Sequence, residues 1–262
     1  MLIQITNTCH MGCSHCLQDS TPAVQHMDAE TVEKAYAFCK RCNVMNVLIS
    51  GGEPTEHPDF EAIVRKFIEF PAVSIISNGS WIGDVKKVAV IRSLLKEPNV
   101  FLQVTSIGGI YKNYDLVKKY EKRILSLGKR VTVHTDKIYI HALGRARYNE
   151  KWLERSREHG YVMSCFQHIL TYKQLPFLDA LHNEEKRGHF CSPLIDWKGR
   201  LHFSESWLCP SFATLDDDFD EIARKAAAWT PCGACPDYQK LLAKTEPIYV
   251  NARVILGIEN KS

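Results

Sequence analysis

The sequence predicts an α/β fold, an open and partial (β/α)6 TIM barrel that is followed by a small C-terminal domain. In the first 165 residues, short apolar runs alternate with amphipathic stretches, and repeated strand–helix units of this kind imply a parallel sheet. About six units are visible, fewer than in a complete barrel of eight, which takes about 250 residues. After residue 167 the alternation stops, and four of the ten cysteines follow. We therefore expect two domains, residues 1–166 and residues 167–262.

The expected strands and helices alternate along the chain. Strands are expected at residues 2–6, 44–50, 72–77, 100–106, 130–135, 137–142 and 161–166. Helices are expected at residues 28–43, 58–70, 84–97, 114–127 and 149–158. Asp28 fits the N-cap of the first helix, and Gly128 closes the fourth. In the C-terminal part, a hairpin is expected over residues 194–204 with its turn at Lys198-Gly199, and a helix over residues 218–230.

Polar or glycine residues follow the expected strands at their carboxyl ends. Gly51-Gly52-Glu53-Pro54 follows the second strand, Asn78-Gly79 the third and Gly108-Gly109 the fourth. Parallel α/β folds build their active sites at the carboxyl ends of the strands. The sequence therefore predicts a functional site at this edge of the sheet.

The composition is that of an ordinary globular protein, with 45% hydrophobic and 24% charged residues and a formal net charge of +3. The lysines and arginines are dispersed, which does not favour a nucleic-acid partner. No run approaches the roughly 18 apolar residues of a membrane span, and the first residues lack the features of a signal peptide. We expect a cytoplasmic protein without a membrane partner, whose clustered cysteines bind metal in a reducing compartment.

Three cysteines lie close together directly after the first expected strand. Cys9, Cys13 and Cys16 have the spacing C-x3-C-x2-C, so one loop supplies three thiolates. This is one ligand fewer than a closed site needs, and it suits a metal or cluster that also binds a substrate. Zinc is the alternative for this motif taken alone. Cys39 and Cys42 are also closely spaced, but they fall within an expected helix and are expected in the core.

With Gly51-Gly52-Glu53-Pro54 after the second strand, this cysteine loop resembles the radical S-adenosylmethionine (SAM) superfamily. In that family the three cysteines hold a [4Fe-4S] cluster, and the fourth iron chelates the amino and carboxylate groups of SAM. The resemblance extends over essentially the whole chain and includes Asn78-Gly79 and the stretches LQVTSIGG (102–109) and LGRARYN (143–149). It implies that Cys9, Cys13 and Cys16 bind the cluster.

The resemblance also implies which residues contact SAM. The two glycines of the GGEP motif let the backbone approach the SAM amino group closely, and Glu53 is the acceptor for that group. Thr105 stands where a hydroxyl meets the ribose, and His15 takes the place of an aromatic residue near the adenine. The implied SAM-binding residues are His15, Gly51, Gly52, Glu53, Pro54, Ser77, Asn78 and Thr105.

Four further cysteines in the C-terminal part supply enough thiolates for a closed site. They are Cys191, Cys209, Cys232 and Cys235, and the expected hairpin separates the first two. This arrangement resembles the Twitch domain, the shortened form of the SPASM domain of radical SAM enzymes, in which four cysteines bind one auxiliary [4Fe-4S] cluster. The resemblance implies a small C-terminal iron–sulfur domain, with a structural zinc site as the alternative.

The resemblance implies an enzyme that uses a 5′-deoxyadenosyl radical to abstract hydrogen and oxidatively modify its substrate. A flavodoxin- or ferredoxin-like donor supplies the first electron, and the auxiliary cluster takes up the surplus one. We expect a peptide or protein substrate, and the alternative is a small molecule such as an amino-cyclitol alcohol. The competing class is a non-catalytic zinc or electron-transfer protein. The candidates for the acid–base residue are His134, Asp136, Tyr139 and His141.

The position of the cysteine loop bears on how a peptide would be recognised. Many relatives that modify peptides carry a recognition domain before this loop, whereas here the first cysteine is residue 9. We therefore expect either a separate peptide-recognition protein as partner or a small-molecule substrate.

Overall fold

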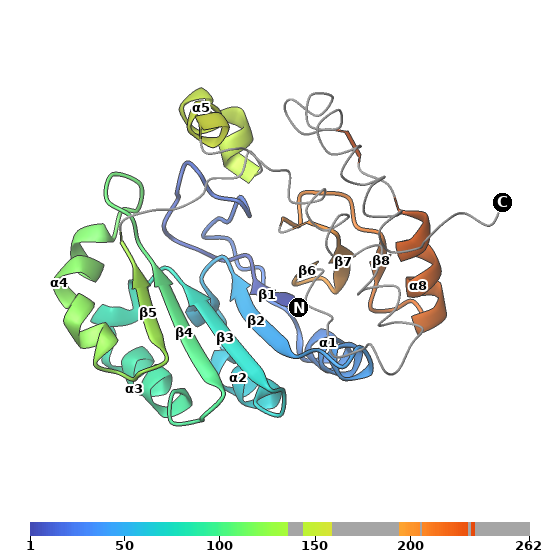
Figure 1. Ribbon diagram of the computed structural model, residues 1–262, viewed down its shortest axis with the longest axis horizontal. Coiled ribbons are helices and arrows are strands. Elements are labelled where there is room, and N and C mark those ends of the chain that lie inside the picture. Colours follow the sequence, from blue (N-terminus) through green and yellow to red (C-terminus); the bar gives the residue numbers. More distant parts are fainter. Residues whose placement is uncertain (136–143, 159–193, 205, 230–231, 234–262) are drawn as a thin grey trace, which may run out of the picture.

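The computed structural model describes residues 1–135, 144–158, 194–204, 206–229 and 232–233. In this part of the chain, eight strands form one open sheet in the order β5-β4-β3-β2-β1-β6-β7-β8 (Figure 1). The strands from β1 to β5 pair in parallel. Their bounds are β1 Leu2–Thr6, β2 Asn46–Gly51, β3 Ala72–Ser77, β4 Val100–Thr105 and β5 Val131–His134.

Helices connect the parallel strands, and Figure 1 shows α1 to α4 placed along the sheet in the same order as the strands. The α-helices are α1 Ala29–Arg41, α2 Phe60–Phe67, α3 Val85–Leu94, α4 Tyr114–Leu125, α5 Glu150–Glu158 and α8 Phe219–Ala228. Short 3-10 helices are η1 Pro54–Glu56, η2 Ser80–Gly83 and η3 Gly144–Tyr148. None of the helices in the described ranges is long and apolar enough to cross a membrane. The open, mostly parallel sheet confirms the predicted α/β class and its partial-barrel form.

The observed elements begin and end within a few residues of the predicted ones. Helix α1 begins at Ala29 because the Asp28 side chain accepts a hydrogen bond from the Thr31 N–H at 2.8 Å. Asp84 and Asp218 cap α3 and α8 in the same way. The strands predicted at residues 137–142 and 161–166 lie outside the described residues.

Alternation along the strands gives the sheet two different faces. On β4, Val100, Leu102 and Val104 are buried in a core that also includes the apolar sides of α1 to α4. Cys39 and Cys42 are fully buried in this core, as predicted. The other face of the sheet, which carries Gln103, is available for a binding site.

The predicted C-terminal hairpin is present and belongs to the same sheet as the parallel strands. β6 (Leu194–Ile195) pairs in parallel with β1, and β7 (Arg200–His202) and β8 (Ala213–Thr214) continue the sheet antiparallel. Gly199, at the predicted turn, has a φ of 73°, which glycine adopts without strain. The predicted boundary between residues 166 and 167 lies outside the described residues.

Asp196 ties this hairpin together from a fully buried position. Its carboxylate accepts hydrogen bonds from the backbone N–H groups of Lys198 and Arg200 and from Arg200 Nε at 2.7 Å. His202 Nε2 lies 3.1 Å from the same carboxylate, and His202 Nδ1 lies 2.8 Å from the carbonyl oxygen of Cys209. Burial opposes ionisation of Asp196, but the hydrogen bonds from His202 and Arg200 outweigh it and lower the pKa of this carboxyl.

Asp196→Asn is expected to lower the free energy of unfolding by about 2 kcal/mol, because charge-assisted hydrogen bonds are lost in a buried position. The midpoint of thermal unfolding should fall by roughly 4–8 °C in a chain of this size. The folded-state pKa is lowered, so the difference from the parent should be present above about pH 4 and shrink as the pH falls through that pKa. Asp216→Asn removes an exposed carboxylate paired with Lys34 and should leave the midpoint unchanged. Equal midpoints for the two variants would contradict this role of Asp196.

Candidate cofactor site

A cavity of about 540 Å³ lies at the carboxyl ends of the parallel strands. Gly51 at the end of β2, Ser77 at the end of β3, Thr105 at the end of β4 and His134 at the end of β5 all line it. The loop after β1 lines the cavity with its three cysteines. The predicted site residues that line the cavity are Cys9, Cys13, His15, Cys16, Gly51, Gly52, Ser77, Asn78 and Thr105.

The three front cysteines are partly shielded from water, and none is in a disulfide. Cys9 is buried, and Cys13 and Cys16 are half-buried. Burial, together with the charges of neighbouring cysteines, raises the pKa of Cys9 to about 12 and that of Cys13 to about 11. Thiolates that repel one another in this way fit a positively charged iron–sulfur core, which binds cysteine as thiolate.

The spacing of the ligands also bears on what the site can hold. Among the described residues, no three His, Cys, Asp or Glu side chains converge on a point that could hold a single metal ion. A four-iron cluster requires a wider arrangement, because each thiolate binds a separate iron. The three cysteines around one cavity are compatible with that arrangement.

The two glycines after β2 allow the GGEP turn to lie directly against β1 and the residues that follow it. The Gly52 N–H donates to the Thr6 carbonyl at 2.7 Å, and the Glu53 N–H donates to the Thr8 carbonyl at 3.0 Å. A Cβ on Gly51 would lie 2.2 Å from the Thr6 oxygen, and one on Gly52 would lie 2.4 Å from the Thr8 oxygen. Glycine is therefore required at both positions by backbone packing alone.

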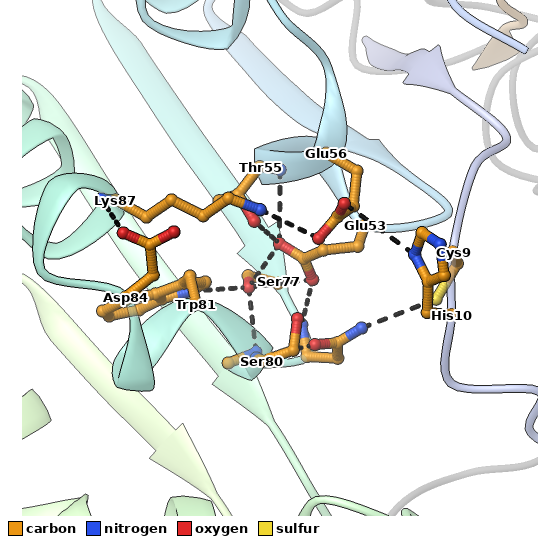
Figure 2. Close-up of polar contacts among 12 residues, drawn as sticks. Cys9, His10, Glu53, Thr55, Glu56, Ser77, Ser80, Trp81, Asp84 and Lys87 are labelled. Atoms are coloured by element: carbon orange, nitrogen blue, oxygen red, sulfur yellow. Dashed lines mark hydrogen bonds and ion pairs between the residues drawn. The ribbon is translucent and has the colours of Figure 1, made fainter. Parts of the chain in front are cut away.

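Glu53 is 1% exposed and connects the ends of β2 and β3 (Figure 2). Its carboxylate accepts hydrogen bonds from the Thr55 N–H at 3.3 Å and the Thr55 hydroxyl at 2.8 Å. It also accepts from the Ser77 hydroxyl at 2.9 Å and the Asn78 N–H at 2.8 Å. Burial raises the pKa of Glu53, and these donors oppose that effect. Neither Glu53 nor Pro54 lines the cavity, so their contact with SAM stays a prediction.

Asn78 extends this network to the first cysteine. Its Nδ2 donates to Cys9 Sγ at 3.6 Å, and its Oδ1 accepts from the Ser80 N–H at 2.8 Å. Asn113 Nδ2 donates to the Asn78 carbonyl at 2.7 Å, so the backbone of Asn78 is fixed as well as its side chain. Hydrogen bonds to ligand sulfurs stabilise clusters and tune their reduction potentials. Asn78 therefore links Glu53 with the cysteine loop.

His15 is buried next to two aromatic rings. Its ring centroid lies 5.0 Å from that of Tyr111 and 5.8 Å from that of Trp152. His15 and Tyr111 both line the cavity, and burial raises the pKa of the Tyr111 phenol. The sequence reasoning missed Tyr111 because it lies in the loop between β4 and α4, where no periodic pattern marks a functional residue.

Side chains from β4 and β5 form a polar wall of the cavity. Thr105 and His134 are register partners at the ends of these strands. Gln103, two residues before Thr105, also lines the cavity, and its register partner on β3 is Ile76. The period of two along a strand could have identified Gln103, since it faces the same side as Thr105. The other acid–base candidates, Asp136, Tyr139 and His141, lie outside the described residues.

The sequence matches the family described as the Radical SAM superfamily over residues 3–168, which is more than half of the chain. The chain belongs to the radical SAM superfamily. Membership implies a [4Fe-4S] cluster and SAM as cofactors of an enzyme. The three cysteines and the strand ends around the cavity fit both groups in charge and in the type of ligand.

Curated relatives of this radical SAM protein match shorter stretches. GTP 3′,8-cyclase of Chlorobaculum tepidum is 30% identical over 81 residues, which cover 29% of this chain and 24% of that protein. A probable GTP 3′,8-cyclase of Methanocella arvoryzae is 30% identical over 79 residues, 30% of this chain and 26% of that protein. The matched stretches thus span about a quarter of the length of these relatives.

Solved structures resemble this radical SAM protein in fold. The structure described as native anSMEcpe with bound AdoMet (SAM) and Cp18Cys peptide is 13% identical and has a TM-score of 0.50. The similarity covers 97% of this chain and 98% of that chain. SuiB of Streptococcus suis is 12% identical, with a TM-score of 0.45 over 89% of this chain and 68% of that chain. At such identities the likeness concerns the fold alone.

Two of the four predicted auxiliary ligands of this radical SAM protein are described. Cys209 is half-buried, and its sulfur accepts a hydrogen bond from the Ser204 hydroxyl at 3.2 Å. Cys232 is exposed. Cys191 and Cys235 lie outside the described residues. The auxiliary site therefore stays a prediction.

Proposed function

We propose that this protein is a radical SAM oxidoreductase of the maturase type, which modifies a peptide or protein and carries one auxiliary [4Fe-4S] cluster. One observation carries this proposal: Cys9, Cys13 and Cys16 share a single cavity with the carboxyl ends of β2 to β5. In this arrangement a cluster, SAM and the substrate carbon can lie next to one another.

The residues of the cavity divide between the two cofactors. The three cysteines bind the cluster, and the backbone at Gly51 and Gly52 lies nearest to the amino acid part of SAM. Ser77, Asn78 and Thr105 offer hydrogen-bonding groups for the rest of SAM, and His15 lies at the adenine. When bound, the cluster and SAM supply a 5′-deoxyadenosyl radical that takes a hydrogen atom from the substrate.

The chain itself orients the substrate and excludes water from the cavity. His134 ends β5, lines the cavity and has a ring that can accept a proton. Of the four acid–base candidates it is the one that the structure describes, and we assign it the proton that accompanies oxidation of the substrate.

Contacts between the C-terminal part and the cysteine loop support an auxiliary cluster close to the front one. The Ser206 hydroxyl donates to the Leu17 carbonyl at 2.8 Å, and Trp207 Nε1 donates to the Gln18 carbonyl at 2.7 Å. The Cys209 N–H in turn donates to the Ser206 carbonyl at 3.2 Å. Leu17 directly follows the third front cysteine, so a short chain of hydrogen bonds connects Cys209 with the loop that carries the front cysteines. A second cluster in this position suits the uptake of the surplus electron.

A peptide substrate is supported by the fold likeness to anSMEcpe, which contains AdoMet and a peptide together and which this chain matches along nearly its whole length. The partners would then be an electron donor of the flavodoxin or ferredoxin type and a separate peptide-recognition protein. A small-molecule substrate, such as an amino-cyclitol alcohol, is the second candidate. It is favoured by the curated relatives, which are named for the small molecule GTP.

Iron and sulfide counts after anaerobic reconstitution test the cofactors. We expect about eight irons per chain, and about four in the variant Cys9→Ala/Cys13→Ala/Cys16→Ala. That variant should form no 5′-deoxyadenosine from SAM and dithionite. The variant Cys209→Ala/Cys232→Ala should also lose about four irons but still cleave SAM. Cys39→Ala is the matched control, since Cys39 is buried in the core and should not affect the iron count.

The result for each site can contradict a separate part of the proposed function. Failure of the parent to cleave SAM would contradict the enzymatic role, and zinc in the C-terminal site would contradict the auxiliary cluster. Incubation with a peptide library and with a panel of polyols, followed by mass spectrometry, distinguishes the substrates. A peptide that loses two hydrogens is the expected product, and an oxidised polyol with unchanged peptides would favour the second candidate.

A further inference from the structure

Residues 144–152, which form η3 and the start of α5, lie against the cysteine loop. The Arg145 N–H donates to the Cys16 carbonyl at 2.9 Å. Trp152 Nε1 donates to the Ser14 hydroxyl at 2.9 Å, and the Trp152 ring lies edge-on to His15. The segment therefore contacts the loop both at the backbone of a cluster-binding cysteine and at its side chains.

The Arg145 guanidinium binds both ends of the stretch 13–20 within this loop. Its Nη1 donates to the Cys13 carbonyl at 2.8 Å, and its Nη2 donates to the Ser20 carbonyl. Its Nε forms an ion pair with the Asp19 carboxylate. The planar guanidinium has donors in a fixed geometry, so one side chain fixes three groups relative to one another. The stretch it fixes, residues 13–20, contains two of the three front cysteines.

Gly144 lies against the backbone of the cysteine loop in a conformation that glycine adopts without strain. Its φ is 56°, and a Cβ at this position would lie 2.2 Å from the Cys16 carbonyl oxygen and 2.4 Å from the Leu17 carbonyl oxygen. Only glycine permits so close an approach of the two backbones. The pair Gly144-Arg145 thus fits the backbone of the cysteine loop.

Arg145 also places a positive charge next to the thiolates. The Arg145 side chain is 26% exposed, and its guanidinium is held on the main-chain carbonyl of Cys13, within one residue of a cluster-binding thiol. A cluster gains negative charge when it is reduced, so a nearby cation stabilises the reduced form and raises the reduction potential. Partial burial limits the screening of this interaction by water.

We propose that Arg145 is a positioning residue for the front cluster, which fixes residues 13–20 and raises the reduction potential of the cluster. This role rests on the front-cluster part of the proposed function and does not depend on the peptide substrate or the auxiliary cluster. Its consequence is a cluster that is both easier to reduce and slower to lose iron.

Three variants of the full chain separate the charge from the hydrogen bonds. Arg145→Gln removes the charge, and Arg145→Lys keeps the charge but loses the planar fork. Arg147→Gln is the matched control, because it removes a charge from the same 3-10 helix, where the guanidinium lies 5.4 Å from the Tyr148 ring. EPR-monitored potentiometry follows the cluster signal that changes on addition of SAM. Iron loss to a chelator is timed without oxygen.

The expected results differ among the variants. Arg145→Gln should have a lower potential than the parent and lose iron about tenfold faster. Arg145→Lys should keep the potential near that of the parent but also lose iron faster. Arg147→Gln should match the parent in both. Equal potentials and equal iron loss in the parent and Arg145→Gln would overturn this role of Arg145.

Hydrogen–deuterium exchange of the chain without iron tests separately whether Arg145 fixes residues 13–20. It also replaces the measurements on Arg145→Gln if that variant does not fold. Arg145→Lys and Asp19→Asn should both exchange faster in residues 13–20, with unchanged exchange in β2 and β3. Exchange at parental rates in both variants would overturn the proposal. None of these measurements uses a peptide substrate, so a failure of peptide modification would leave their results unaffected.

Discussion

Replacing Glu53 with alanine is expected to lower the free energy of unfolding by about 3–5 kcal/mol, because buried donors lose their shared acceptor. These donors are the N–H and hydroxyl of Thr55, the Ser77 hydroxyl and the Asn78 N–H. The midpoint of thermal unfolding should fall by roughly 10 °C or more. Because Asn78 donates to Cys9 Sγ, the variant should also lose iron to a chelator faster than the parent.

Two further variants isolate the carboxylate. Glu53→Gln should cost about 1–3 kcal/mol, since an amide accepts at one end only and leaves a backbone N–H of Thr55 or Asn78 facing an NH2 group. Glu56→Ala is the matched control in the same turn. Glu56 is 27% exposed and pairs with Lys87 at 2.9 Å, and such a pair contributes less than about 1 kcal/mol. If Glu53→Ala and Glu56→Ala unfold at the same temperature, Glu53 does not stabilise the fold through its buried hydrogen bonds.

Local patterns were enough to predict the parallel part of the fold. Strands β2 to β5 and helices α1 to α4 each bury one apolar face, and the residues of that face recur at the period of a strand or a helix in the local sequence. β8 has only two residues, Ala213–Thr214, and exists because Leu201 on β7 pairs with Ala213. The pairing of Leu2 with Leu194 joins segments that lie far apart in the sequence, and no local period specifies such a partner.

The residues that line the cavity were predictable where motif spacing fixes them relative to a strand. The front cysteines and the strand-end residues Ser77 and Thr105 are of this kind, and the structure places them in one cavity. The contacts of Arg145 were not predictable. Its partner Asp19 lies 126 positions away, and the contact depends on how residues 144–152 pack against the cysteine loop. The surroundings of Glu53 likewise depend on the pairing of β2 with β3, which brings Ser77 to it.

Gly52→Ala is expected to be far more disruptive than the addition of one methyl group suggests. The Cβ would lie 2.4 Å from the carbonyl oxygen of Thr8 and 2.7 Å from its carbonyl carbon. Both partners are backbone atoms, so no side-chain rotation relieves the overlap. Thr8 directly precedes Cys9, and relief requires a shift of the GGEP turn or of the first cysteine. We expect a fall of about 3 kcal/mol or more in the free energy of unfolding and a loss of most SAM cleavage.

Gly83→Ala provides the matched control, because Gly83 ends η2 and a Cβ there would meet no atom within 4 Å. Its midpoint of thermal unfolding should stay close to that of the parent, and its formation of 5′-deoxyadenosine should be unchanged. A Gly52→Ala chain that unfolds and cleaves SAM like the Gly83→Ala chain would contradict the close packing of the GGEP turn on the cysteine loop. If SAM cleavage falls by more than the amount of folded protein, the turn positions Cys9 as well as stabilising the fold, since the overlap lies one residue from that ligand.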